Sequence, residues 1–229
     1  RQRAAMRVVV WNVRRLSNSV GDCARDQVLS TLRLLQPSLI ALNEVSVESP
    51  HPPHSVSELA EALGLRHYAF FGHVRGTYGN ALISAAPIQR VVETRLDGGV
   101  EVQSRSGAKH RIVRGMLSCD TSIGGVGLRV AVTHLDHISE YQRAIQAQHI
   151  INVMASETER QVLLLGDLNA LSKSDYTSAE WQDHEKHNQD RGWAPPADAL
   201  APFTHQNANP SRDGEEGREG GGGGGGAGD

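Results

Sequence analysis

The sequence is poor in cysteine and contains neither a long apolar run nor a secretory leader. Only Cys23 and Cys119 occur in 229 residues, which allows one disulfide at most and fits free, buried thiols in a reducing compartment better. No apolar run approaches the roughly 18 residues that a membrane span needs. The beginning of the chain, RQRAAMRVVVW, lacks the apolar segment and the cleavage site of a signal peptide. We therefore expect an intracellular, cytoplasmic protein.

An excess of basic charge is absent as well. The segment 211–229, SRDGEEGREGGGGGGGAGD, contains two arginines and five acidic residues. Residues 1–210 contain 21 basic and 21 acidic side chains, so their formal net charge is zero. Residues 1–210 therefore lack the strongly basic charge of many nucleic-acid-binding domains. Their neutral balance is compatible with a small or lipid-borne ligand.

Glycine is common only at one end of the sequence. Ten of the 24 glycines fall in 211–229, and they show no G-X-Y period, which excludes a collagen-like chain. We expect an N-terminal extension over 1–6, one folded domain over 7–210 and a disordered, acidic, glycine-rich tail over 211–229. Because the sequence does not begin with methionine and Met6 precedes the first apolar run, we expect a fragment.

Apolar and β-branched runs, bounded by turn residues, predict many strands. Strands are expected over residues 7–13, 38–42, 67–71, 81–84, 89–94, 111–118, 128–133 and 161–165. Helical spacing predicts helices over 26–35, 55–63 and 139–156. Beyond residue 171 the pattern weakens, because 183–191 (DHEKHNQDR) is almost wholly polar. Alternating helices and strands followed by consecutive strands predict an α/β (α+β) sandwich, with sheets packed together and helices outside.

Polar residues interrupt four of the apolar strands at their carboxyl ends. They are Asn12, Glu44, His134, and Asp167 with Asn169. Each residue alone is an ordinary cap or turn residue, but strand ends are also where such sheets place binding groups. Oxygen ligands predominate and cysteine is absent, which suits a hard cation such as Mg²⁺ that keeps several waters. The pattern therefore predicts a metal site at one edge of the sheets.

Five segments in this order resemble the endonuclease/exonuclease/phosphatase superfamily, the Mg²⁺-dependent phosphoesterases that include deoxyribonuclease-like and sphingomyelinase-like enzymes. The segments are WNVRRL at 11–16, LIALNEV at 39–45, YGNALIS at 78–84, VTHLDH at 132–137 and LLGDLNA at 164–170. The resemblance covers about residues 7–171. It implies a four-layer sandwich of two packed mixed β-sheets flanked by helices.

The resemblance also implies a role for each strand-end residue. Glu44 is expected to be the principal ligand of Mg²⁺, or alternatively Mn²⁺, and Asn12 to ligate or hydrogen-bond the metal–phosphate assembly. His134 is expected to donate a hydrogen bond to a non-bridging phosphate oxygen. Asp167 is expected to orient the attacking water, and Asn169 to contact the phosphate or the entering oxygen.

Three further residues are expected near the same site. Asn80, in the YGN segment, is expected to shape the site and bind substrate, and Arg14 is expected to reach a phosphate. Asp136 is expected either to hold its own loop or to contact the site. The predicted reaction is hydrolysis of a phosphodiester or phosphomonoester by in-line attack of water. The substrate stays open among nucleic acid, lipid and small molecule, and a monomer is expected.

The sequence departs from the family pattern towards its end. Members continue with an I-D-Y-I-like segment and a terminal S-D-H, and neither is found here. The segment 202–214 (PFTHQNANPSRDG) resembles the approach to the first of them, and His205 is the only late histidine. We therefore expect a domain truncated at its C-terminal end. An inactive remnant or binding protein is the alternative function.

Zinc is a competing interpretation of the histidines. Three pairs have H-x-x-H spacing: His51/His54, His134/His137 and His184/His187. THLDH resembles the H-x-H-x-D-H motif of metallo-β-lactamase-like hydrolases, but Val132 stands in place of its first histidine. HEKH is one residue shorter than H-E-x-x-H. A zinc hydrolase is therefore the less favoured alternative.

Overall fold

A computed structural model describes residues 6–48, 56–103, 107–155, 160–194, 200 and 203 of the chain. Several sequence predictions lie outside the described residues. They concern His51, His54, His205, the extension before Met6 and the tail over 211–229.

The first sheet has four strands in the order β1-β2-β4-β3. Their bounds are β1 Val8–Asn12, β2 Leu39–Ser46, β3 His67–Val74 and β4 Tyr78–Ser84. β1 and β2 run parallel, whereas β4 pairs antiparallel with both β2 and β3. The carboxyl ends of β1 and β2 therefore lie next to each other at one end of a mixed sheet.

The second sheet repeats this arrangement, with the order β10-β9-β8-β5. Its strands are β5 Gln89–Arg95, β8 Gly115–Ile123, β9 Val126–His134 and β10 Gln161–Asp167. β10 runs parallel to β9, and the other pairs are antiparallel. A separate hairpin consists of β6 Val100–Gln103 and β7 Lys109–Ile112.

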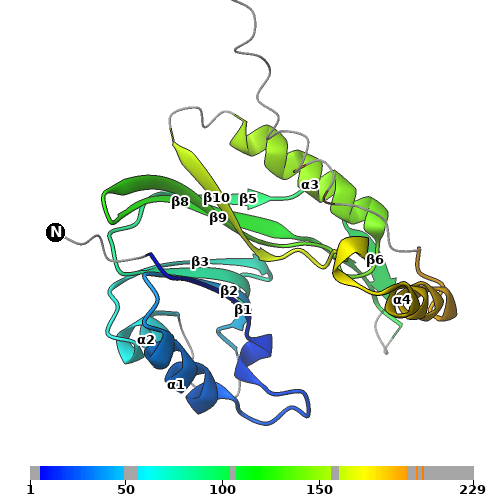
Figure 1. Ribbon diagram of the computed structural model, residues 1–229, viewed down its shortest axis with the longest axis horizontal. Coiled ribbons are helices and arrows are strands. Elements are labelled where there is room, and N and C mark those ends of the chain that lie inside the picture. The colour runs from blue at the N-terminus through cyan, green and yellow to red at the C-terminus, as the bar shows by residue number, and fades with distance from the viewer. Residues whose placement is uncertain are drawn as a thin grey trace, which may run out of the picture.

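The helices cover the outer faces of the two sheets (Figure 1). α1 Arg25–Leu35 and α2 Val56–Ala62 lie on the first sheet, and α3 Glu140–Met154 lies on the second. The Ser139 hydroxyl caps α3 by accepting from the N–H of Gln142. The order helix, sheet, sheet, helix confirms the predicted four-layer sandwich of two mixed sheets.

The alternation of side chains along β2 shows how the layers pack. Ile40 and Leu42 contact α1 and α2, whereas Leu39 and Ala41 face the second sheet, and all four are fully buried. A third apolar cluster, which includes Ile150 of α3, covers the outer face of the second sheet. Because both faces of the central strands are buried, these strands are continuous apolar runs, and they hold the polar residues at their ends in place.

Three sequence predictions need correction. The strand expected over 111–118 is two strands, because β7 ends at Ile112 and β8 begins at Gly115. A helix, α4 Ser178–Asp190, occupies the polar region in which no helical or strand pattern is predicted; Thr177 starts it with a capping box. Cys119 is free and buried as expected, but free Cys23 is exposed. Two 3₁₀ turns, Arg14–Leu16 and Lys173–Asp175, complete the described elements.

No helix in the described part of the chain combines the length and the apolar character needed to cross a membrane.

Candidate active site

Polar side chains from both sheets meet at the carboxyl ends of the parallel strands. Asn12 ends β1 and lies opposite Asn43 of β2, whereas Asp167 ends β10 and lies opposite His134 of β9. A cavity of about 920 Å³ opens at this place. Six residues that were predicted for the site line it: Asn12, Arg14, Glu44, His134, Asp167 and Asn169.

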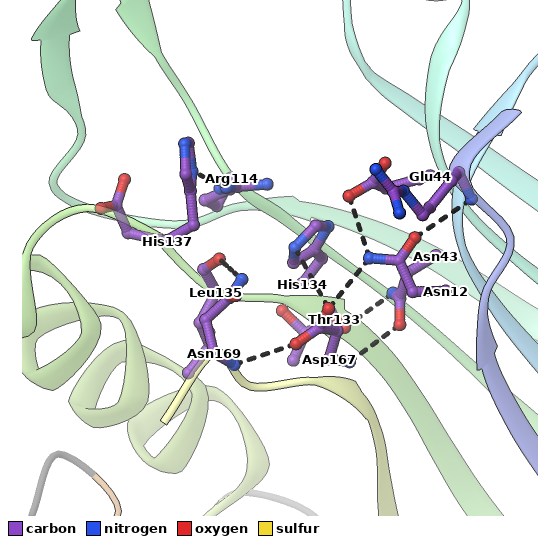
Figure 2. Close-up of polar contacts among 12 residues, drawn as sticks. Asn12, Asn43, Glu44, Arg114, Thr133, His134, Leu135, His137, Asp167 and Asn169 are labelled. Atoms are coloured by element: carbon purple, nitrogen blue, oxygen red, sulfur yellow. Dashed lines mark hydrogen bonds and ion pairs between the residues drawn. The ribbon is translucent and has the colours of Figure 1, made fainter. Parts of the chain in front are cut away.

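The Asn12 amide joins two carboxylates that come from different sheets (Figure 2). Its nitrogen donates to Oε1 of Glu44 and to Oδ2 of Asp167, in both cases at 2.9 Å. Its oxygen accepts from the backbone N–H of Arg14 at 3.2 Å, an arrangement that fixes the orientation of the amide. Because two carboxylates held by one amide repel each other, the arrangement favours a cationic ligand near them.

Glu44 faces the cavity because β2 is irregular at this position. The pairing of β2 with β4 shifts register between Leu42 and Val45, and Glu44 has a φ of 59°. Such a φ is uncommon outside glycine, and strained backbone of this kind concentrates at functional sites. The Tyr78 side chain hydrogen-bonds to Glu44, and burial together with the Glu44 charge raises the pKa of Tyr78. Tyr78 thus stays protonated and can donate to the carboxylate.

Asp167 is held through both its backbone and its side chain. Its N–H donates to Oδ1 of Asn43 at 2.8 Å, and its Oδ1 accepts from the N–H of Asn169 at 3.1 Å. The preceding residue, Gly166, has a φ of 140°, and a Cβ there would collide with the carbonyl of Thr133 on β9. Only glycine allows this close approach, so Gly166 determines where the Asp167 carboxylate lies.

Asn169 connects the segments that follow β9 and β10. Its side-chain nitrogen donates to the carbonyl oxygen of Leu135 at 3.0 Å (Figure 2). Its φ of 49° is left-handed, a conformation that asparagine tolerates better than most residues. The local turn therefore places the Asn169 amide at the edge of the cavity.

His134 is a buried imidazole, 4% exposed, between the two carboxylates and an arginine. Its Nε2 lies 3.7 Å from Oδ2 of Asp167. Burial and then the charge of Arg114 lower the pKa of His134 to about 4, against the opposing effects of Asp167 and Glu44. The ring is therefore neutral near pH 7 and carries one N–H donor and one acceptor.

Asn80 does not line the cavity, contrary to the substrate contact predicted for it. Its side chain is fully buried, and its nitrogen donates to the carbonyls of Gly115 and Val132 at 2.9 and 3.4 Å. Its oxygen accepts from Nδ2 of Asn43 at 2.9 Å, and the same nitrogen of Asn43 donates to the Thr133 carbonyl at 2.8 Å. The two amides join the sheets behind the cavity. Sequence analysis missed Asn43, although it interrupts an apolar strand.

Arg14 lines the cavity from an exposed position just after β1. Its neighbour Arg15 places its guanidinium over the ring of Tyr78, 5.0 Å from the centroid. Because the Arg14 side chain is exposed at the cavity, contact with a bound phosphate stays a prediction for this residue.

Several basic or imidazole side chains that line the cavity have no predicted role there, among them His73, Arg95 and Arg114. His137 also lines it, although the sequence suggests this residue only as part of a zinc pair. Nη2 of Arg114 lies 2.8 Å from Nδ1 of His137 (Figure 2). Burial and then the Arg114 charge lower the pKa of His73 to about 4. The sequence signal for Arg114 is weak, because the residue falls in a run, 111–118, that predicts one continuous strand.

Asp136 and the His184/His187 pair lie in other settings, whereas His134 and His137 both line the cavity. Asp136 is fully buried and its Oδ1 accepts from the N–H groups of Ile138 and Ser139, both at 2.8 Å, so it holds its own loop. The rings of His184 and His187 pack against aromatic rings instead. In the parts of the chain that the structure describes, no group of three or more His, Cys, Asp or Glu side chains could hold a metal ion.

The donor set at the strand ends nevertheless fits Mg²⁺. This ion is usually held by one or two carboxylates, with water and substrate phosphate completing its coordination. Glu44 and Asp167 supply two carboxylates that share one amide donor. Such a site needs no third carboxylate or histidine, which separates it from a typical zinc site.

Comparison with protein families gives one match over most of the chain. The model of the Endonuclease/Exonuclease/phosphatase family matches residues 9–213. Among curated proteins, none matches the chain significantly.

Several solved structures have a similar fold at low sequence identity. They include the human Nocturnin catalytic domain with bound sulfate (TM-score 0.55, 19% identity, 73% of this chain and 65% of that chain). A functionally unknown conserved protein from Enterococcus faecalis V583 has a TM-score of 0.55 and 18% identity over 73% of this chain and 68% of that chain. TDP2 from D. rerio, complexed with a single-strand DNA product, has a TM-score of 0.55 and 18% identity over 73% of this chain and 62% of that chain. The chain thus spans less than two thirds of the Nocturnin and TDP2 chains, and these likenesses show the shared fold.

Proposed function

The chain belongs to the endonuclease/exonuclease/phosphatase family, and on this premise we propose that it is a metal-dependent phosphoesterase that hydrolyses a phosphodiester or phosphomonoester. The observation that carries the proposal is the convergence of Glu44 and Asp167, from different sheets, on the single amide nitrogen of Asn12. The convergence lies in a cavity large enough for a substrate of several hundred cubic ångströms.

Glu44 is the ligand that we propose for Mg²⁺, or for Mn²⁺ in its place. A divalent cation bound there would offset the charge of the phosphate and polarise its oxygens. The Asn12 amide donates to the carboxylate through nitrogen, so its proposed role is to hold Glu44 in place. Tyr78, at the start of the neighbouring strand β4, restrains the same carboxylate.

Asp167 is proposed to orient the attacking water and to accept its proton. Three contacts fix the residue: the Asn12 amide, the Asn43 oxygen and the Asn169 N–H. The oxygen of the water forms a bond to phosphorus while the bond from phosphorus to the leaving oxygen breaks. The leaving oxygen keeps the bonding electron pair and takes a proton from solvent. Asn169, at the cavity edge, is proposed to contact the phosphate or the entering oxygen.

His134 is proposed to stabilise charge on the phosphate. A neutral imidazole donates one N–H to a non-bridging oxygen, and a preorganised donor in a buried site stabilises the transition state more than it would in water. Arg14 is proposed to add a contact to the phosphate from the mouth of the cavity.

Hydrolysis of bis(p-nitrophenyl) phosphate in H₂¹⁸O tests the proposed reaction. With Mg²⁺ present, we expect p-nitrophenyl phosphate that carries one ¹⁸O, detected by mass spectrometry, and no reaction in EDTA. An Asp167→Asn variant should lose most of this product, whereas Asp26→Asn, at an exposed position on α1, should not. Product without ¹⁸O, or equal yields from both variants, would reject the proposal. Binding of the diester without its hydrolysis would indicate a binding protein instead.

A further inference from the structure

The cavity also has a lining of a different chemical kind from the carboxylates. Arginine and histidine side chains form this lining, and we call this group the cationic wall. It consists of His73, Arg95, Arg111, Arg114 and His137. None of these residues has a role in the hydrolysis proposed above.

The strand order places two members of the cationic wall, His73 and Arg95, at the sheet edges away from the carboxylates. In the first sheet, Asn12 and Glu44 lie on β1 and β2, and His73 lies on β3 at the other edge. In the second sheet, Asp167 ends β10, and Arg95 ends β5 at the other edge. Both sheets therefore present the same order, with a carboxylate towards one side and a histidine or an arginine at the other edge. A ligand that spans the cavity meets both.

Arg114 is a buried charge whose contact on this wall is an uncharged ring. It is 5% exposed, and its Nη2 lies 2.8 Å from Nδ1 of His137. Burial and the Arg114 charge lower the pKa of His137, and an imidazole carries no negative charge that could balance the guanidinium. No described carboxylate lies within ion-pair distance of Arg114, and its Nε has no hydrogen-bond partner among the described residues. Burial lowers the pKa of Arg114 in spite of the opposing charges of Asp136, Glu44 and Asp167, which lie beyond ion-pair distance. An anionic ligand in the cavity would supply a closer counter-charge to this buried group.

His73 supplies a second unsatisfied group on the same wall. It is 2% exposed, and neither of its ring nitrogens makes a hydrogen bond of good geometry within the described segments, although the Phe71 backbone lies close enough to act on its pKa. Its ring packs edge-on against Phe71, with 5.8 Å between centroids, and a Cβ on Gly115 would collide with both residues. The ring is therefore fixed at the cavity, and its N–H group is available to a ligand. Buried polar atoms are nearly always hydrogen-bonded in proteins, so a ligand is the natural partner.

Two further arginines of the wall are anchored by backbone carbonyls. Nη1 of Arg95 donates to the carbonyl of His73 at 3.0 Å, and Nη2 of Arg111 donates to the carbonyl of Gly98 at 3.1 Å. Neither bond neutralises the positive charge. The whole cavity is lined by six arginines but only three acidic residues, although residues 1–210 have no net charge. The positive excess is therefore local to the cavity.

From this arrangement we propose that the cationic wall is a subsite for a second phosphate group of the substrate. The substrate class is then a phosphoester that carries another phosphate, with the scissile group at the carboxylates and the other at Arg114 and His73. The assignment of the two ends rests on the proposed function, because that function places the scissile phosphate beside Glu44. Arginine and imidazole N–H donors are suited to such a group, since charge-assisted hydrogen bonds to phosphate are strong.

Metal-free binding tests the cationic wall without any need for turnover. Inorganic phosphate is titrated into the full chain in EDTA by isothermal titration calorimetry. We expect Arg114→Met to weaken binding by about tenfold, the equivalent of one charge-assisted contact. Arg66→Met, which removes an exposed arginine away from the cavity, is the matched control and should bind phosphate as the wild type does. His73→Phe is the second test variant, should Arg114→Met fail to fold by circular dichroism.

The outcomes separate the subsite from the proposed reaction. Phosphate binding that is absent in the wild type, or equal in the wild type and both test variants, overturns the subsite. Binding that depends on Arg114 in a chain without hydrolytic activity upholds the subsite and rejects the proposed function.

Kinetics with Mg²⁺ tests the second phosphate itself. Thymidine 5′-(p-nitrophenyl phosphate) is compared with the same compound carrying a 3′-phosphate. We expect kcat/KM to be about tenfold higher for the phosphorylated compound in the wild type and in Arg66→Met, and the ratio to fall towards one in Arg114→Met.

Inhibition identifies the source of the second phosphate. Thymidine 3′,5′-bisphosphate and myo-inositol 1,4-bisphosphate are each compared with their monophosphates as inhibitors. Stronger inhibition by either bisphosphate than by its monophosphates supports the subsite. The more effective bisphosphate also shows whether a nucleoside or an inositol carries the second phosphate. Equal inhibition by mono- and bisphosphates of both scaffolds, together with equal kcat/KM values, overturns it.

Discussion

The side-chain amides of Asn43 and Asn80 are hydrogen-bonded to each other at 2.9 Å, and both residues are fully buried. Asn43 lies on β2 and Asn80 on β4, and each amide also bonds to a backbone carbonyl of the second sheet. The Asn43 oxygen in addition accepts from the N–H of Asp167. The pair therefore couples the packing of the two sheets to the position of a candidate catalytic carboxylate.

Replacing Asn43 by alanine should destabilise the protein strongly. The substitution leaves buried partners of the amide unsatisfied, at a cost of about 1–3 kcal/mol for each. Urea unfolding measures the free energy of unfolding, and Asn152→Ala, on the exposed side of α3, is the control, which we expect to lose less than about 0.5 kcal/mol. Equal losses in the two variants would show that the Asn43 network does not join the sheets.

Gly166→Ala should reduce both stability and phosphoesterase activity. The added Cβ collides with the Thr133 carbonyl, and the φ of 140° is unfavourable for alanine, so β10 must move away from β9 and displace Asp167. Gly127→Ala, on β9, is the matched control, because nothing lies within 4 Å of a Cβ at that position. Thermal unfolding and hydrolysis rates of the two variants test this. If Gly166→Ala matches Gly127→Ala in both Tm and hydrolysis rate, the close approach of Gly166 to the Thr133 carbonyl is contradicted.

The free energy of unfolding should fall as the pH is lowered from about 6.5 to about 4. Burial, with help from Arg114, lowers the pKa of His73 from 6.5 to about 4 in the folded protein, so the unfolded chain binds more protons between these values. The resulting stability is complete above pH 6.5 and is lost as the pH falls towards 4. His73→Phe should reduce this slope by up to about 1.4 kcal/mol per pH unit.

Urea unfolding at several pH values measures that slope. His67→Asn, a substitution on the same strand, is the control for the loss of a histidine. A slope that His73→Phe leaves as steep as in the wild type would contradict the neutral, buried imidazole.

Mg²⁺ should stabilise the wild-type chain against heat, and Glu44→Gln should remove most of that effect. A cation at ten times its Kd adds about 1.4 kcal/mol to the free energy of unfolding. Without Mg²⁺, Glu44→Gln should instead raise Tm slightly, because it relieves the repulsion between the two carboxylates. Glu61→Gln, on exposed α2 surface, should respond to Mg²⁺ as the wild type does. Equal Mg²⁺ effects in both variants would place the cation elsewhere.

The strand-end residues were predictable from the sequence because their environment is local. Asn12, Glu44 and Asp167 each interrupt an apolar run, and parallel pairing of neighbouring strands brings such ends to one edge. The apolar runs also predicted the sandwich, since strands buried on both faces need covering layers. What the pattern could not show is which polar residue lies in front of the cavity and which behind it. Asn80 was therefore placed at the substrate, although it is buried.

The cationic wall could not be predicted, because its members come from strand edges and loops far apart in the sequence. His73 is one histidine among 11 and Arg114 lies between two strands that the sequence joined into one. α4 was missed for a different reason: a polar helix has no apolar stripe, and only Trp181 is buried in it. Its capping residue, Thr177, was the one local signal of its start.

The most direct test of the account is the rate of p-nitrophenolate release from bis(p-nitrophenyl) phosphate at saturating Mg²⁺. Wild type, Glu44→Gln and Glu61→Gln are compared under the same conditions. We predict a Mg²⁺-dependent rate in the wild type and in Glu61→Gln, and a rate at least about a hundredfold lower in Glu44→Gln. A wild-type rate equal to that of Glu44→Gln would contradict a phosphoesterase site at the carboxyl ends of the parallel strands.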